Sequence, residues 1–172
     1  MCAAEMKMPG MASELIMDLR GTLEWLKQEG DLMETDHPVD PDIELTAIQK
    51  NMDGSCPILF NNVKGKPNHR AVTNLFGDMN VVNKMFGWTD DVDRTKKLSY
   101  ALDHPLPPVE IGQEEAPCQE VVIEDPVNVN DYIIPIRHTE YEPELTVGSG
   151  NRVVAGKYFD GGTDLGYNRM NF

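Results

Sequence analysis

The first hundred residues alternate between capped helix patterns and short apolar runs, and this alternation constrains the fold more than any other feature. Asp18 is a suitable N-cap for a helix with leucines at helical spacing, and Gly30 is suited to end it. Asp40 is expected to cap a second helix with Pro41 at its first position, where the missing N–H of proline costs nothing. Gly54 is expected to end that helix.

Three short apolar runs separate the helix patterns and are typical of strands. A third helix is bounded by Asp78 as its cap and Gly87 as its stop, and a fourth is expected from about Val92 to Leu102. The alternation predicts an α/β domain over residues 18–104. No GxGxxG or GxxxxGK[ST] motif supports a Rossmann or P-loop nucleotide site. The strand candidates are Leu32–Thr35, Pro57–Phe60 and Ala71–Thr73.

The composition changes at His104, where prolines and glutamates replace the helical pattern. Such a segment is stiff and polar, so residues 105–118 are predicted to form a linker. The runs after it are strand-like and punctuated by glycines, which predicts the first part of an antiparallel β-domain over residues 119–172. Residues 1–17 are expected to form a flexible tail, and the chain is α+β overall. The later strand candidates are Glu120–Glu124, Tyr132–Ile134, Val147 and Val153–Ala155.

Composition excludes several classes of function. The formal net charge of -14 argues against binding to nucleic acid or to anionic membranes and favours simple solubility in a cytoplasm. Three widely spaced cysteines without a CxxC pair predict neither a zinc site nor a disulfide framework. There is no signal peptide pattern and no run approaching the roughly 18 apolar residues of a membrane span. His138 has no partner visible in the sequence and is expected to be a structural loop residue.

The closing segment, residues 161–172, carries the chemistry. Asp164 and Arg169 lie five positions apart in an extended pattern, so in a regular strand they face opposite sides about 16 Å apart. Gly166 could mark a bulge that relaxes this rule. The segment would then offer a metal ligand at Asp164 and a positively charged group that binds an anion at Arg169. The alternatives are a turn aspartate at position 164 and a surface arginine at position 169.

Six blocks in order resemble the UbiD family of decarboxylases, which use prenylated FMN. One such block would be weak, but six in the order of the family form a specific pattern that runs from residue 18 to the end of the chain. In the family pattern the fifth block corresponds to "LPIP…ITAG" and the last to "NxGxYRM". The blocks are Asp18–Leu26 with Gly30–Leu32, Val39–Leu45, Leu59–Gly65, Thr73–Gly77, Ile134–His138 with Leu145–Gly150, and Asp164–Met170.

The resemblance implies a fold, a reaction and cofactors. Members have an N-terminal α/β domain, a split β-barrel that holds the flavin, and a C-terminal domain. They remove or add a carboxylate on aromatic or α,β-unsaturated acids, and the prenylated flavin is the electron sink. A divalent metal, usually Mn²⁺, ties the flavin phosphate to the protein with K⁺ nearby. The first strands of the barrel would then occupy residues 119–172.

The last block carries the site residues that the resemblance implies. Asp164 falls where the family usually has a metal-binding asparagine, and its carboxylate still suits Mn²⁺ or Mg²⁺, although it adds negative charge beside a phosphate. Tyr167, Asn168 and Arg169 match the stretch that contacts the flavin. Arg169 also matches the arginine near the substrate carboxylate, and its planar fork suits bidentate binding of that group.

The downstream elements of the family do not occur in this sequence, so the chain is expected not to be an enzyme by itself. The missing elements are two metal ligands, the carboxylates that deliver the proton, and the C-terminal domain. A barrel with only its first strands would expose unpaired edges, which folded proteins avoid. We therefore expect a piece of a longer polypeptide or a small subunit of a homo- or hetero-oligomer. The alternative is a non-catalytic binding or assembly subunit in which Asp164 marks decay of the metal site.

Overall fold

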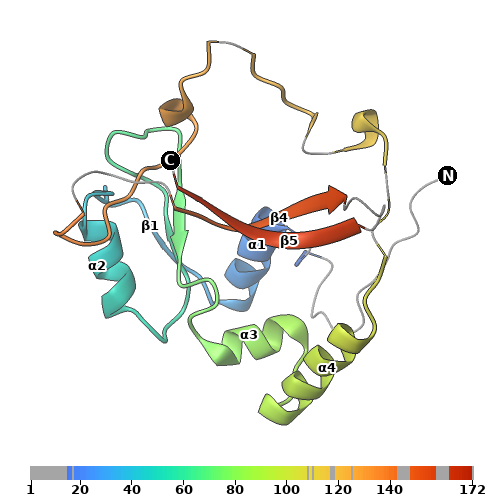
Figure 1. Ribbon diagram of the computed structural model, residues 1–172. Helices are drawn as coiled ribbons and strands as arrows, with labels where there is room; N and C mark the ends of the chain where they lie inside the picture. The colour runs from blue at the N-terminus through green and yellow to red at the C-terminus, as the bar shows by residue number, and fades with distance from the viewer. Residues whose placement is uncertain are drawn as a thin grey trace. The chain divides into compact units, whose positions relative to one another are not determined.

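The computed structural model describes most of the chain from residue 15 onward, and Figure 1 labels its main helices and strands. The described ranges are 15–16, 18–107, 109, 111–116, 119–124, 126–142, 148–157 and 163–171, the last two as strand backbone. The helices are α1 (Leu19–Glu29), α2 (Glu44–Asn51), α3 (Met79–Phe86) and α4 (Asp91–Asp103). The strands are β1 (Met33–Thr35), β2 (Ile58–Phe60), β3 (Ala71–Thr73), β4 (Gly148–Lys157) and β5 (Thr163–Asn171).

Helices α1 and α3 begin and end at the residues that the sequence predicts. Asp18 accepts a hydrogen bond from the Gly21 N–H at 2.7 Å, and Asp78 accepts one from the Asn80 N–H at 2.8 Å. Both helices end at a glycine in the left-handed region, where a side chain would be strained. Local caps therefore fix both ends of each helix.

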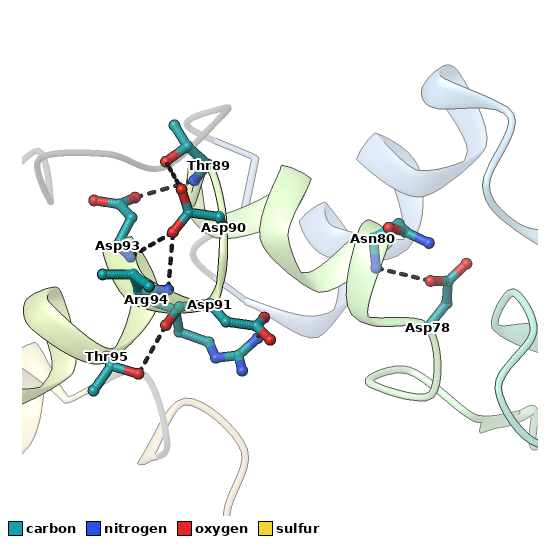
Figure 2. A network of polar contacts seen from close by, with 9 residues as sticks. Asp78, Asn80, Thr89, Asp90, Asp91, Asp93, Arg94 and Thr95 are labelled. Carbon is teal, nitrogen blue, oxygen red and sulfur yellow. Dashed lines mark hydrogen bonds and ion pairs between the residues drawn. The ribbon is translucent and has the colours of Figure 1, made fainter.

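Helix α4 begins in a network of carboxylate caps (Figure 2). Asp90 accepts hydrogen bonds from the N–H groups of Val92 and Asp93, each at 2.8 Å. Asp93 in turn accepts one from the Thr89 N–H at 3.0 Å and contacts the Lys97 ammonium at 2.9 Å. Asp90 thus satisfies two of the donors that the helix N-terminus leaves without partners, and Asp93 binds the residue before the cap. This confirms the fourth helix, one residue longer at each end than expected.

Acid should weaken the start of α4. The hydrogen bond from Lys97, and then that from the Thr89 N–H, hold the pKa of Asp93 below its ordinary value. The stability that this carboxylate contributes is present above the ordinary aspartate pKa and is lost as the pH falls through the lowered one. We expect the helical far-ultraviolet circular dichroism to fall more in acid for the wild type than for Asp93→Asn, which has no charge to lose. Identical acid titrations of the two proteins would contradict this expectation.

Helix α2 begins later than the sequence predicts. The expectation that Pro41 occupies its first turn is wrong, because α2 begins at Glu44. Residues 42–44 instead form a turn in which the Asp42 carbonyl accepts from the Glu44 N–H at 2.8 Å, and Ile43 has φ +69°. An α-helix cannot contain a residue at positive φ, so the helix starts only after Ile43.

The strands of the α/β part form a three-stranded sheet with the order β1-β2-β3, which agrees with the predicted alternation of helices and strands. All three residues of β2 are buried, which confirms the expected buried strand. Two later strand candidates are wrong: residues 121–124 have no regular structure, and residues 132–134 form no strand. Val121 and Val122 are 73% and 64% exposed, and no described strand pairs with them. Valine-rich sequence forms a strand only where a hydrogen-bonding neighbour is present.

The chain divides into two compact units, each built from separate stretches of sequence. Unit 1 contains the hydrophobic cluster of α1 and α3, in which Leu26 is fully buried and Met85 is 1% exposed. Trp25 packs in the same cluster, as expected from its helix. In unit 2, Val39 and Val63 are each 1% exposed. Unit 1 is Met1–Glu34, Met52–Leu59 and Val72–Asn128, and unit 2 is Thr35–Asn51, Phe60–Ala71 and Val129–Phe172.

The architecture agrees with the α/β part of the sequence prediction. The described residues supply four α-helices and one three-stranded sheet, with a separate antiparallel pair, β4 and β5. None of the described helices is long and apolar enough to cross a membrane.

Candidate functional site

The four residues that the sequence singles out all lie on β5. This strand pairs with β4 in antiparallel register, in which Asp164 lies opposite Gly156, Tyr167 opposite Val153, and Asn168 opposite Arg152. The expectation of an extended closing segment is therefore confirmed. The side chains of these residues lie outside the part of the chain that the structure describes, as does the predicted strand residue Val147.

The one irregularity of the pair lies opposite Arg169. Ser149 pairs with Met170 and Arg152 pairs with Asn168, so two residues of β4, Gly150 and Asn151, face a single residue of β5. This is the pattern of a β-bulge, and bulges change the direction of nearby side chains and are frequent beside functional sites. The bulge that Gly166 would permit does not occur at that position, because Gly166 pairs with Val154 in the regular register. The extra residue is instead accommodated in β4, at Gly150 and Asn151.

A second polar feature joins residues far apart in the sequence. Arg137 forms an isolated parallel bridge with Asp42, in which the Arg137 N–H donates to the Pro41 carbonyl and the Ile43 N–H donates to the Arg137 carbonyl, each at 3.1 Å. The guanidinium Nε lies 2.5 Å from a carboxylate oxygen of Asp42. This hydrogen bond, aided by the opposite charge, raises the pKa of Arg137 above its ordinary value.

His138 has its partner within the same loop. Its backbone N–H donates to the Glu142 carboxylate at 2.5 Å, and its Nδ1 lies 3.4 Å from the same oxygen. The backbone bonds from His138 and Thr139 hold the pKa of Glu142 below its ordinary value. These contacts agree with the structural loop role expected of His138.

The contact between Asp42 and Arg137 is the feature that sequence reasoning missed. The two residues stand 95 positions apart, and no spacing rule relates them. The signal for this contact in the sequence was the opposite charge of the two residues, each of which lies in one of the six blocks that resemble the family. Among the side chains that the structure describes, no group of three or more His, Cys, Asp or Glu residues could hold a metal ion. Asp164 lies outside that set, so its proposed role as a ligand depends on the sequence.

Comparisons with known proteins point to one family. Residues 23–102 match the family model described as the 3-octaprenyl-4-hydroxybenzoate carboxy-lyase N-terminal domain. The chain is 29% identical to the phenolic acid decarboxylase of Sedimentibacter hydroxybenzoicus over 152 residues, which cover 83% of this chain and 31% of that protein. It is 32% identical to the gallate decarboxylase of Lactiplantibacillus plantarum over 116 residues, which cover 61% and 24%.

The fold agrees with this match. An evolved dimeric form of the UbiD-class enzyme HmfF from Pelotomaculum thermopropionicum, solved in complex with prFMN, superposes with a TM-score of 0.71 at 24% identity. The superposition covers 87% of this chain and 34% of that one. The chain thus spans about a third or less of the length of the relatives it matches. The match over residues 23–102 and the agreement in fold together identify this part of the chain as a UbiD-family N-terminal domain.

Proposed function

We propose that this chain is the N-terminal part or a small subunit of a prenylated-FMN-dependent decarboxylase that acts reversibly on an aromatic or α,β-unsaturated acid. The single observation that carries the proposal is the match to a phenolic acid decarboxylase over 83% of the chain. A gallate decarboxylase among the relatives and a structural neighbour in complex with prFMN support it. We assign the protein to the cytoplasm.

The proposed domain organisation follows the family pattern. Residues 1–17 would be a tail and residues 18–104 the α/β domain. Residues 105–118 would be a linker, and residues 119–172 would be the start of the split β-barrel. In this view β4 and β5 are two barrel strands whose remaining neighbours come from further polypeptide, either in the same chain or in a partner subunit.

The side chains that β5 would offer to the cofactor supply only part of its binding site. Asp164 offers one hard oxygen to Mn²⁺ or Mg²⁺, and such ions take about six oxygen donors, so the remaining ligands must come from elsewhere. Tyr167 and Asn168 would contact the flavin, with K⁺ near its phosphate. The prenylated flavin, when bound, supplies an electron sink for the pair of electrons left by departing CO₂.

Arg169 would bind and orient the acid. Its guanidinium offers two parallel N–H donors to the two oxygens of a carboxylate, which fixes the plane of that group. It keeps its charge at any working pH, so only protonation of the acid itself would weaken this contact. The proton that replaces CO₂ would be delivered by a carboxylic acid from the further polypeptide.

Mass and absorbance of the purified protein test this proposal. We expect the chain to purify with flavin absorbance, as a species heavier than 19.3 kDa or with a co-purifying chain. Elemental analysis should find manganese or magnesium in the same fractions. A lone monomer of 19.3 kDa without flavin would refute the proposal. That result would favour the non-catalytic assembly subunit, to which the aspartate at position 164 in place of asparagine also points.

A further inference from the structure

Arg137 is held at three points by residues 41–43. Its N–H donates to the Pro41 carbonyl, and its own carbonyl accepts from the Ile43 N–H, both at 3.1 Å. Its Nε donates to the Asp42 carboxylate at 2.5 Å. The side chains of this ion pair are 28% and 45% exposed, so water screens it only in part. Two backbone bonds and one charged bond fix both the position and the direction of the segment around Arg137.

The backbone of residues 41–43, which contact Arg137, is strained at Ile43. Ile43 has φ +69°, and the Asp42 carbonyl accepts from the Glu44 N–H two residues on, which makes a three-residue turn of the rare type. For a β-branched residue this φ is an outlier, because the side chain collides with the backbone. Such strain persists only where the surroundings hold it, and the hydrogen bond from Ile43 to Arg137 is one of the contacts that hold it.

The same stretch is braced from the other side. Asp40 accepts from the Asp42 N–H at 2.9 Å, and Glu44 accepts from the Asp40 N–H at 2.7 Å. The Lys64 ammonium lies 3.5 Å from the Asp40 carboxylate and 3.6 Å from that of Glu44. Asp42 therefore has hydrogen-bond partners on both sides, and its pair with Arg137 joins this turn to a segment without regular secondary structure.

We propose that Arg137 is a positioning residue whose pair with Asp42 fixes the segment 129–142, which precedes β4 and β5 in the chain. The segment belongs to the same compact unit as the two strands, and it is attached again where the Lys66 ammonium donates to the Asn130 carbonyl. Fixing this segment limits the positions available to the strand that carries Arg169. The part of this inference that concerns the flavin rests on the proposed function, whereas the part that concerns the strands does not.

Amide hydrogen exchange of the purified protein tests the positioning role. We expect Arg137→Ala to speed exchange about fivefold at the Ile43 amide and across β4 and β5, because one partly exposed charged bond is lost. Asp42→Asn should do the same, and the double variant should add nothing further, because both changes remove one pair. The matched control is Lys97→Ala, which removes an ion pair of 2.9 Å within α4 and should leave these amides unchanged.

The outcome at the strands decides the proposal. Faster exchange confined to residues 40–44 and 134–138, with β4 and β5 at the wild-type rate, would overturn the positioning role and leave a local contact. Additive effects in the double variant would overturn the pairing.

FMN itself serves as the probe for the flavin, and we expect Arg137→Ala to weaken its binding about fivefold if the strands form its site. A wild-type protein that binds no FMN even with all its polypeptide present would count against the proposed function, while the exchange results would still decide the positioning role.

Discussion

Replacing Arg169 with alanine is expected to lower kcat/KM for the acid substrate by about a thousandfold while the flavin stays bound. The proposed role of Arg169 is to bind the carboxylate that leaves as CO₂, and removing one such charged donor from a site that excludes water costs on the order of a hundredfold to a thousandfold. Turnover should be measured on the enzyme with all its polypeptide present, and the flavin absorbance of the same sample should be recorded.

Two further variants make this result specific. Arg169→Lys keeps the charge but loses the two parallel donors, so we expect it to recover only part of the activity. Arg152→Ala removes the same charge from the neighbouring strand, at the position that pairs with Asn168, and should leave turnover close to the wild-type rate. Full activity in Arg169→Ala would remove this residue from the site. Loss of the flavin together with the activity would assign it to cofactor binding instead.

Replacing Leu26 with alanine is expected to destabilise unit 1 by about 3 kcal/mol. Leu26 is fully buried in the cluster of α1 and α3, and a buried leucine cut to alanine loses its transfer free energy and leaves a cavity. Denaturant unfolding followed by the fluorescence of Trp25, which packs in the same cluster, measures this change.

The matched control lies on the same helix. Leu19 is 51% exposed, so Leu19→Ala makes the same chemical change where little surface is buried, and it should cost well under about 1 kcal/mol. Equal losses in the two variants would show that the cluster does not carry the stability of α1. If Leu26→Ala lowers the free energy of unfolding without changing its slope against denaturant concentration, the substitution acts on the folded state.

Much of the fold was predictable because interactions between residues close in the sequence determine where the helices begin and end. Asp18, Asp78 and the glycines that end α1 and α3 act within one turn of the helices they bound, so their effects can be read directly from the sequence. The errors have a different origin. Pro41 looks like a first helical residue, but Asp42 and Ile43 are engaged by Arg137 from a distant part of the chain. Tertiary contacts of this kind override local preference.

The sequence predicted the extended segment that carries the candidate residues but not the position of the bulge beside them. The closing motif identified four residues, and the structure brings all of them onto β5. The sequence favoured Gly166 for the irregularity, because glycine is the residue that most often permits one. The bulge lies in β4 instead, because the register of a strand pair depends on both strands and only the pairing reveals which of them carries the extra residue.

The interleaving of the two units sets an order for chain synthesis. Residues 35–51 and 60–71 leave the ribosome early, but the rest of their unit begins at residue 129. The carboxylate of Asp42 therefore cannot pair with Arg137 until that residue has been made, 95 positions later. The α1 and α3 cluster needs only residues up to Met85 and closes a shorter loop. The part of the chain that carries the family match can thus begin to pack while the strand bearing Arg169 is still to be synthesised.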